Sequence, residues 1–199
     1  MTSAALVATV AACGQQSDSR TDEQPGDAGV VTAPADVASE VAASTPYVTL
    51  DCVSLQGSPT DAPPADAVTV DAASAIFQPN GAPAITIATS NSPATELGYA
   101  DITVGDGAEV QPTDTVTVDY CGVGYGGQAV FDSSWATGQP ATFPLTNLIQ
   151  GWQDGIPGMK VGGQRLLVIP GELAYGEAGT QGIGPNETLA FVIQLESIG

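Results

Sequence analysis

The chain has 199 residues, enough for one domain of ordinary size or two small ones. It holds 3 Lys and Arg against 22 Asp and Glu, so its net charge of −19 excludes the basic surface that nucleic-acid binding or a cationic membrane-surface helix requires. The absence of His excludes Ser-His-Asp and Cys-His nucleophiles and the usual His-rich metal sites, while 24 Gly and 15 Pro favour strands joined by turns over long helices.

Residues 1–13 have the pattern of a secretion signal. The apolar run 6–12 has the length of a signal core and is too short to span a bilayer. The string Val10-Ala11-Ala12-Cys13 resembles a bacterial lipobox, which implies that Cys13 is acylated and becomes the mature N-terminus. Because no Lys or Arg precedes the run, we expect the true start to lie further upstream. An ordinary secretory signal with a chance Cys is the alternative.

Two further segments precede the C-terminal half. Residues 14–45 are rich in Ser, Asp, Gln, Ala, Gly and Pro, and they predict a disordered acidic linker, either a tether or a tail without purpose. Residues 46–96 predict a β-rich extension, with strands over 47–53, 67–70 and 84–87. Turn signals separate these strands at 57–59, 62–64 and 79–81. No motif for chemistry occurs there, so we interpret the extension as structural.

Residues 97–199 predict an α+β domain. Strict alternation over 115–121 places Val116, Val118 and Tyr120 on one face of a strand and Cys121 on the other. Further strands are predicted over 129–134, 140–145, 165–170 and 189–195, the third of them central because it is apolar on both faces. One short helix is predicted to carry Leu148, Ile149, Trp152 and Ile156 on one face and to end at the glycines of 159–163.

Six strings in this region resemble the FKBP-type peptidyl-prolyl cis-trans isomerases, in the family's order and near its spacing. The resemblance covers residues 97–199 and implies a curved, half-open antiparallel sheet wrapped around one short helix. The strings are Val118–Gly122, Val130–Ser134, Ile149–Trp152, Gly158–Gly163, Pro170–Gly176 and Ile183–Phe191.

The resemblance implies an isomerase that speeds rotation about X-Pro bonds without a cofactor, a metal or a covalent intermediate. Trp152 would form the floor of a proline pocket, Phe131 and Phe191 its walls, and Asp132 its polar rim. The Ile149 N–H and the Tyr175 hydroxyl would donate to substrate carbonyls. The catalytic set is Tyr120, Phe131, Asp132, Ile149, Trp152, Tyr175 and Phe191, with Leu148, Ile183 and Ala141 as further substrate-binding residues.

Two departures from the family pattern affect the pocket. Many members pair the aspartate with an Arg a few residues later, whereas residues 135–139 carry no positive charge, so Asp132 must find other donors or stay more solvated. A wall aromatic often follows the next Pro, but Ala141 follows Pro140, which predicts a wider pocket. A module that binds proline-containing chains with little turnover is therefore the alternative function.

The three cysteines point to an oxidising compartment. If Cys13 is acylated, Cys52 and Cys121 remain, and we expect them to form a disulfide on the face opposite the pocket, with two buried free thiols as the alternative. The expected location is extracytoplasmic, anchored to the cell membrane by lipid, or secreted if the lipobox is not used. The expected partners are proline-containing chains and tacrolimus-like macrolides, bound by a monomer.

Overall fold

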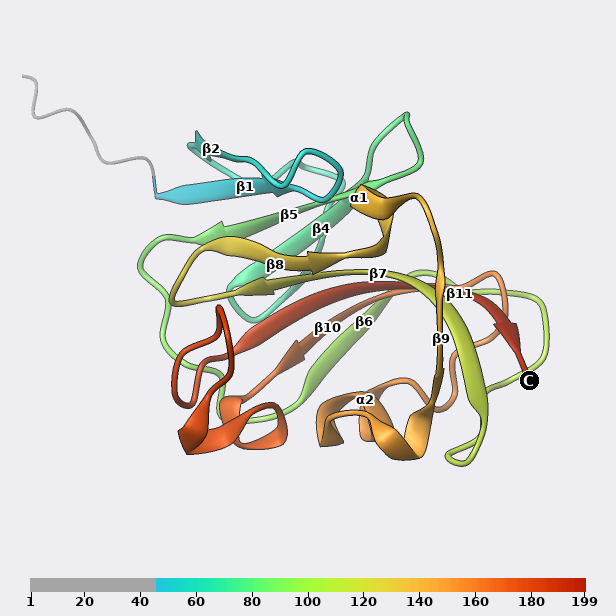
Figure 1. Ribbon diagram of the computed structural model, residues 1–199. Coiled ribbons are helices and arrows are strands. Elements are labelled where there is room, and N and C mark those ends of the chain that lie inside the picture. The colour runs from blue at the N-terminus through green and yellow to red at the C-terminus, as the bar shows by residue number, and fades with distance from the viewer. Residues whose placement is uncertain (1–45) are drawn as a thin grey trace, which may run out of the picture. The chain divides into compact units, whose positions relative to one another are not determined.

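The computed structural model describes residues 46–199, all of which lie in one compact unit, Ala42–Gly199. The predicted signal, the linker and Cys13 lie outside the described residues. The described part forms two antiparallel sheets (Figure 1). No helix within it is long and apolar enough to cross a bilayer.

The first sheet is built from the β-rich extension. It has five strands in the order β2-β1-β5-β4-β3. The strands are β1 (Tyr47–Asp51), β2 (Gly57–Thr60), β3 (Val68–Val70), β4 (Ala73–Phe77) and β5 (Pro83–Ala88). The predicted strands over 47–53, 67–70 and 84–87 correspond to β1, β3 and β5, whereas β4 was not predicted.

Strand β2 occupies residues that were predicted as a turn. Its Pro59 pairs opposite Val48 of β1, and β2 lies at the edge of the sheet. An edge strand tolerates proline because the missing N–H faces solvent instead of a neighbouring strand. The turn interpretation of 57–59 was therefore wrong.

The second sheet belongs to the C-terminal half. Its strand order is β6-β10-β11-β7-β8, and β9 also pairs with β7. The strands are β6 (Gly98–Thr103), β7 (Thr115–Gly124), β8 (Ala129–Ser133), β9 (Ala141–Pro144), β10 (Gln164–Ile169) and β11 (Leu189–Ile198). The helices are α1 (Ser134–Thr137) and α2 (Gln150–Gly155), with 3-10 turns η1 (Leu145–Asn147), η2 (Gly171–Leu173) and η3 (Gly176–Ala178).

Strand β7 is long and curved, and it pairs with two different strands along one edge (Figure 1). Its first part, Thr115–Val118, pairs with β9, and its last part, Cys121–Gly124, pairs with β8. Tyr120 lies between the two pairings. Helix α2 packs against one face of this sheet, so the predicted curved antiparallel sheet wrapped on one short helix is confirmed.

Strand β10 and the first half of β11 are buried on both faces of the second sheet, which explains their nearly continuous apolar sequences. Along β11, Leu189, Phe191 and Ile193 lie in the core cluster that contains Trp152 of α2. Ala190 and Val192 lie in a second cluster with residues of the first sheet. Strand β10 lies between β6 and β11 with Arg165–Ile169 buried, so its predicted central position is confirmed.

Helix α2 is shorter than predicted. It begins at Gln150 and ends at Gly155, so Leu148 and Ile149 precede it. Pro157 explains the early end, because proline has no N–H to donate the next helical hydrogen bond after the one from Ile156 to the Trp152 carbonyl. The glycines at 158 and 162 adopt positive φ angles of 84° and 85° in the turns that follow.

The two sheets are joined covalently. Cys52, just after β1, and Cys121 of β7 form a disulfide with Cα atoms 5.9 Å apart. Beside it, the Ser133 hydroxyl donates a buried 2.6 Å hydrogen bond to the carbonyl oxygen of Cys52. Cys121 belongs to the core cluster between the sheets, so the disulfide lies on the face of β7 opposite α2.

Candidate active site

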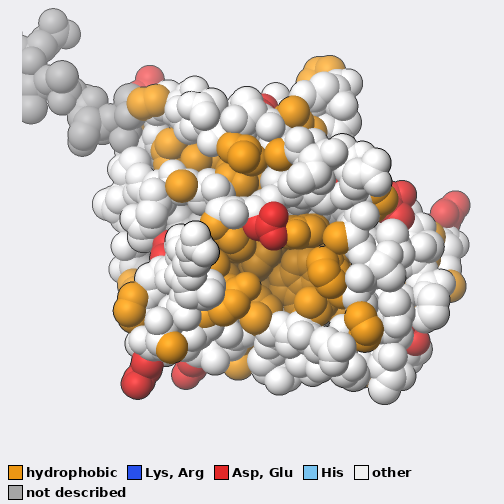
Figure 2. All heavy atoms as spheres, in the orientation of Figure 1, with side chains coloured by type: hydrophobic (Ala, Val, Ile, Leu, Met, Phe, Trp, Pro, Cys, Tyr) orange, Lys and Arg blue, Asp and Glu red, His pale blue; other side chains and the backbone are white. Residues whose placement is uncertain are grey.

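A cavity of about 250 Å³ opens on the α2 side of the curved sheet. Figure 2 shows it as an apolar hollow with an acidic side chain at its rim and no basic side chain on this face. Nine residues from six parts of the fold line it: Tyr120, Phe131, Asp132, Phe143, Leu148, Ile149, Trp152, Tyr175 and Phe191.

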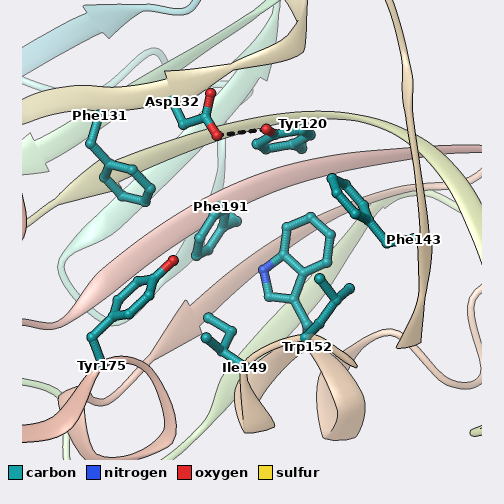
Figure 3. A pocket seen from close by; sticks show the side chains of 9 residues that line it. Tyr120, Phe131, Asp132, Phe143, Ile149, Trp152, Tyr175 and Phe191 are labelled. Atoms are coloured by element: carbon teal, nitrogen blue, oxygen red, sulfur yellow. Dashed lines mark hydrogen bonds between the residues drawn. The ribbon is translucent and has the colours of Figure 1, made fainter. Parts of the chain in front are cut away.

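Trp152 forms the floor of this pocket. Its side chain is held by edge-on contacts with the rings of Phe191, at 5.2 Å between centroids, and Tyr120, at 5.7 Å. The residue is only 4% exposed, and its indole Nε1 is buried without a hydrogen-bond partner among residues 46–199. Figure 3 shows this nitrogen on the side of the ring that faces Tyr175 and Phe191. The floor is thus rigid and presents one unused donor.

Phe131 of β8 and Phe191 of β11 form one wall. Their centroids are 5.6 Å apart and their rings are nearly perpendicular, at 85°. Gly122 of β7 lies between these strands and makes the arrangement possible. A Cβ atom there would lie 2.5 Å from Phe131 Cζ and 2.7 Å from Phe191 Cε1, closer than packed atoms approach. The glycine is required by this close approach, since its φ is not in the left-handed region.

Asp132 and Tyr120 form the polar part of the rim. The Tyr120 hydroxyl donates a 2.6 Å hydrogen bond to Asp132 Oδ2 (Figure 3). Burial raises the pKa of Tyr120 well above its ordinary value, and the hydrogen bond to Asp132 with its negative charge raises it further. The phenol therefore stays a donor at all physiological pH values. Tyr120 is thus a side-chain donor to Asp132 in the described part of the chain.

The backbone of Tyr120 is also fixed. Its N–H donates to Ser134 Oγ at 2.9 Å, and the Ser134 hydroxyl donates to Asp119 Oδ1 at 2.6 Å. Ser134 begins α1, directly after β8. This short network holds the start of α1 against β7 and fixes the strand that carries the Tyr120 ring.

Two donors at the pocket have no acceptor among residues 46–199: the Ile149 N–H and the Tyr175 hydroxyl. Ile149 is the residue before α2, and its carbonyl accepts from the Trp152 and Gln153 N–H groups. Tyr175 lies between η2 and η3 and is 38% exposed, with its hydroxyl directed into the pocket (Figure 3). Both groups are therefore available to a bound chain.

Glu187 ties together two loops near the pocket. Its Oε1 accepts hydrogen bonds from the N–H groups of Gly126 and Gly127, in the β7–β8 turn, at 2.8 and 3.0 Å. Its Oε2 accepts from the Gly184 N–H at 2.6 Å. One carboxylate thus holds the turn after β7 against the loop that follows Tyr175.

The structure brings together most of the residues named from the sequence. The pocket is lined by Tyr120, Phe131, Asp132, Leu148, Ile149, Trp152, Tyr175 and Phe191, but not by Ile183 or Ala141. Ile183 is 6% exposed and its side chain is packed in the core instead. Ala141 is too short to reach the cavity.

Phe143 lines the side of the pocket that the sequence predicted to be wider because Ala141 follows Pro140. Its ring contacts those of Tyr120, at 6.1 Å, and Trp152, at 6.3 Å. Sequence reasoning missed it, although the period of two along β9 places Phe143 on the same face as Ala141. The missing aromatic after Pro140 is thus partly replaced from two residues further along the strand.

Within residues 46–199 no three His, Cys, Asp or Glu side chains are grouped so as to hold a metal ion. The lining itself contributes one charged group, Asp132. The site is an aromatic pocket with a few hydrogen-bond donors at its edge.

Comparison with known proteins agrees with this geometry. The family model of the FKBP-type peptidyl-prolyl cis-trans isomerases matches residues 107–196. The probable FK506-binding protein of Corynebacterium glutamicum is 52% identical over 102 residues, which are 51% of this chain and 86% of that protein. The chain belongs to the FKBP-type peptidyl-prolyl cis-trans isomerase family.

Other members of the family are also similar. The FK506-binding protein of Streptomyces anulatus is 46% identical over 110 residues, 53% of this chain and 89% of that protein. The crystal structure of FkpA from Escherichia coli is 42% identical and covers 54% of this chain and 50% of that chain, with a TM-score of 0.49.

Proposed function

We propose that this chain catalyses cis–trans isomerisation of X-Pro bonds and that the aromatic pocket is its active site. The observation that carries the proposal is the pocket itself. Six of its nine lining residues are aromatic, and a single carboxylate with two unused donors lies at its edge. That composition fits a small apolar ring with a peptide chain on either side of it.

The reaction needs no bond-forming group. Resonance in the amide creates a rotation barrier of about 18–20 kcal/mol, which makes uncatalysed isomerisation take roughly tens of seconds. A catalyst must bind the twisted amide more tightly than the planar one. The twisted amide has less charge separation, so a water-excluding aromatic pocket favours it over the planar form. The lining holds no Ser, Cys or Lys side chain to act as a nucleophile.

Some pocket residues would bind the proline ring of the substrate, and others would bind the peptide backbone on either side of it. The proline ring would lie on Trp152 between Phe131 and Phe191. The Ile149 N–H and the Tyr175 hydroxyl would donate to carbonyl groups on the two sides of the ring and hold the chain while the amide turns. The carbonyl of the rotating bond would lie near the rim that Asp132 and Tyr120 form.

The test is a protease-free isomerisation assay on a protein whose refolding is limited by proline, with the full chain as catalyst. We expect acceleration in the wild type and its loss in Trp152→Leu, which removes the floor. Circular dichroism and a urea midpoint must show that the variant is folded. If a folded Trp152→Leu variant accelerated refolding as much as the wild type does, the pocket would not be the active site.

The same assay separates catalysis from the alternative function. If the folded wild-type chain binds a proline-containing peptide but leaves the refolding rate unchanged, the chain is a binding module. We favour catalysis, because the Tyr175 hydroxyl and the unpaired Trp152 indole N–H both lie at the pocket in which the proline ring would bind (Figure 3).

We further propose that the pocket takes tacrolimus (FK506), because two similar proteins are named for binding it. Phe143 narrows the side of the pocket that Ala141 leaves open. Inhibition of the refolding assay by tacrolimus is the expected result. Acceleration without inhibition would mean that this pocket admits proline but not the macrolide.

Finally, we propose that the protein works outside the cytoplasm on exported chains, as a monomer anchored by lipid on Cys13. The Cys52–Cys121 disulfide supports an oxidising compartment. Expression of the natural gene in its host and fractionation test the anchor: the wild type should sediment with membranes and Cys13→Ala should not. Recovery of both in the soluble extracytoplasmic fraction would favour the ordinary secretory signal.

A further inference from the structure

Asp132 is an acid without a cationic partner. Its Oδ2 accepts from the Tyr120 hydroxyl, and no basic side chain lies within ion-pair distance of either oxygen among residues 46–199. The residue is exposed, and its carboxylate lies at the mouth of the pocket. A ligand in the pocket therefore meets one full negative charge at the rim.

The two basic residues of the described chain are elsewhere. Arg165 is 4% exposed and is held by Asp101, at 2.7 Å from its Nε, and by the Gly155 carbonyl oxygen, at 2.7 Å from Nη1. Its guanidinium also lies 4.3 Å from the ring centroid of Tyr99. Lys160 borders a separate hollow with Asp101 and Met159. Neither contributes to the pocket lining, so the rim charge is not neutralised from within the fold.

We propose that Asp132 is a specificity determinant that makes this pocket favour lysine directly before proline over an uncharged analogue and over glutamate. The inference rests on the proposed isomerase function and names its substrate class. Within the pocket the proline ring occupies the aromatic floor, and the rotating amide is attached to the ring nitrogen. The residue before proline is thus held at the rim, where a flexible four-carbon lysine stem can bring its ammonium to the free Asp132 Oδ1.

The solvent exposure of Asp132 sets the expected size of the preference for lysine. A single exposed ion pair stabilises weakly because water screens it. We therefore expect kcat/KM for a peptide with Lys before Pro to be about two- to fivefold above that of an uncharged analogue, and a Glu peptide to fall below it by a similar factor. The Lys advantage should shrink at about 0.5 M salt, because added ions screen exposed charges.

The experiment uses the full chain and four peptides that differ only at the residue before proline: Lys, acetyl-lysine, Gln and Glu. Acetyl-lysine keeps the stem of lysine and removes its charge. Isomerisation is followed by NMR exchange, which needs no protease. The expected order of kcat/KM is Lys above acetyl-lysine and Gln above Glu.

Two variants identify the origin of the preference. In Asp132→Asn the ratio of kcat/KM for Lys to that for Glu should fall towards one, whatever the absolute rate. Asp61→Asn removes the same charge from an exposed turn of the first sheet, and its ratio should match the wild type. A ratio that survives Asp132→Asn would assign the preference to the general negative charge of the chain and overturn the role of Asp132.

Failure of this inference differs from failure of the proposed function. If the Gln and acetyl-lysine peptides are not accelerated, the chain is not an isomerase on such substrates. If both are accelerated and the Lys and Glu peptides turn over equally, the pocket is an active site and Asp132 does not select its substrates.

Discussion

The hydroxyl of Tyr120 and the carboxylate of Asp132 join β7 to β8 at the pocket rim, 2.6 Å apart. Tyr120→Phe keeps the ring contacts and removes only this donor. A hydrogen bond to a charged group contributes about 1.5–3 kcal/mol, and partial exposure favours the lower end, so kcat/KM should fall about tenfold. The isomerisation assay measures the loss.

Tyr125→Phe is the matched control for this change. The Tyr125 side chain lies in the core cluster between the two sheets, away from the pocket, and its hydroxyl donates to the exposed Asp71 at 3.3 Å. This variant should lose about 1 kcal/mol of stability in urea unfolding and keep its kcat/KM. Equal losses of activity in the two variants would mean that Tyr120 acts through stability alone.

Gly122→Ala should distort the pocket wall by displacing the rings of Phe131 and Phe191. The added methyl group would press on Phe131 and Phe191, and overpacking of this kind costs about 1–3 kcal/mol. We expect kcat/KM to fall at least about tenfold, with the tacrolimus affinity reduced in parallel. In Gly127→Ala, in the turn that follows, the methyl group would meet only Glu187 Oε1 at 4.0 Å, an ordinary contact, so both values should stay unchanged. Full activity in Gly122→Ala would show that the two rings are free to move.

The disulfide should account for a large part of the stability of the described region. Its cysteines are 69 residues apart, and closing a loop of that size contributes about 4 kcal/mol in the chain-entropy model. Cys52→Ala/Cys121→Ala should lower the free energy of unfolding in urea by roughly that amount, and dithiothreitol should then have no further effect.

Thiol counting checks the same bond directly. In denaturant without reductant, the wild-type chain should expose no thiol from Cys52 or Cys121, so that at most Cys13 reacts. Two additional reactive thiols would show that the bond does not form in solution.

Asp51 should contribute to acid sensitivity. Its carboxylate accepts from Gln78 at 2.8 Å and from the N–H and hydroxyl of Ser54, with the Gln78 bond the largest cause of a pKa lowered to about 2. The unfolded chain, with its ordinary value of 3.8, takes up a proton first. This contribution is therefore complete above pH 3.8 and is lost as the pH falls through 2.

Urea midpoints at pH 5 and pH 2.5 measure that loss. In Asp51→Asn the midpoint should fall less between the two pH values than in the wild type, because the variant cannot take up the proton. An identical fall in both proteins would show that the carboxylate is not linked to folding.

The strands that carry the pocket were predictable because their patterns are local. Alternation along residues 115–121 and 189–195 assigned Tyr120 and Phe191 to the correct face, and the opposite face of β7 placed Cys121 between the sheets. Periodicity works along residues 115–121 because successive side chains of a strand point to opposite faces, and the apolar residues of one face alternate here with Thr and Asp on the other.

The errors arose where tertiary context outweighs local sequence. Pro59 reads as a turn residue and becomes part of an edge strand because β1 supplies its partner. Ile183 reads as a pocket residue, but its side chain is taken into the core. Phe143 reaches the pocket because β9 pairs with the first part of β7, a pairing that no short window of sequence reveals.

The double pairing of β7 separates the pocket into two parts that can vary independently. Phe131, Asp132 and Phe143 all come from one continuous excursion, residues 129–144, that leaves β7 through β8 and returns to it through β9. Trp152 comes from α2 and Ile149 is the residue before it, both outside that excursion. Exchanging residues 129–144 as a cassette between relatives would replace the rim while leaving the floor in place, so substrate choice can diverge without rebuilding the site of rotation.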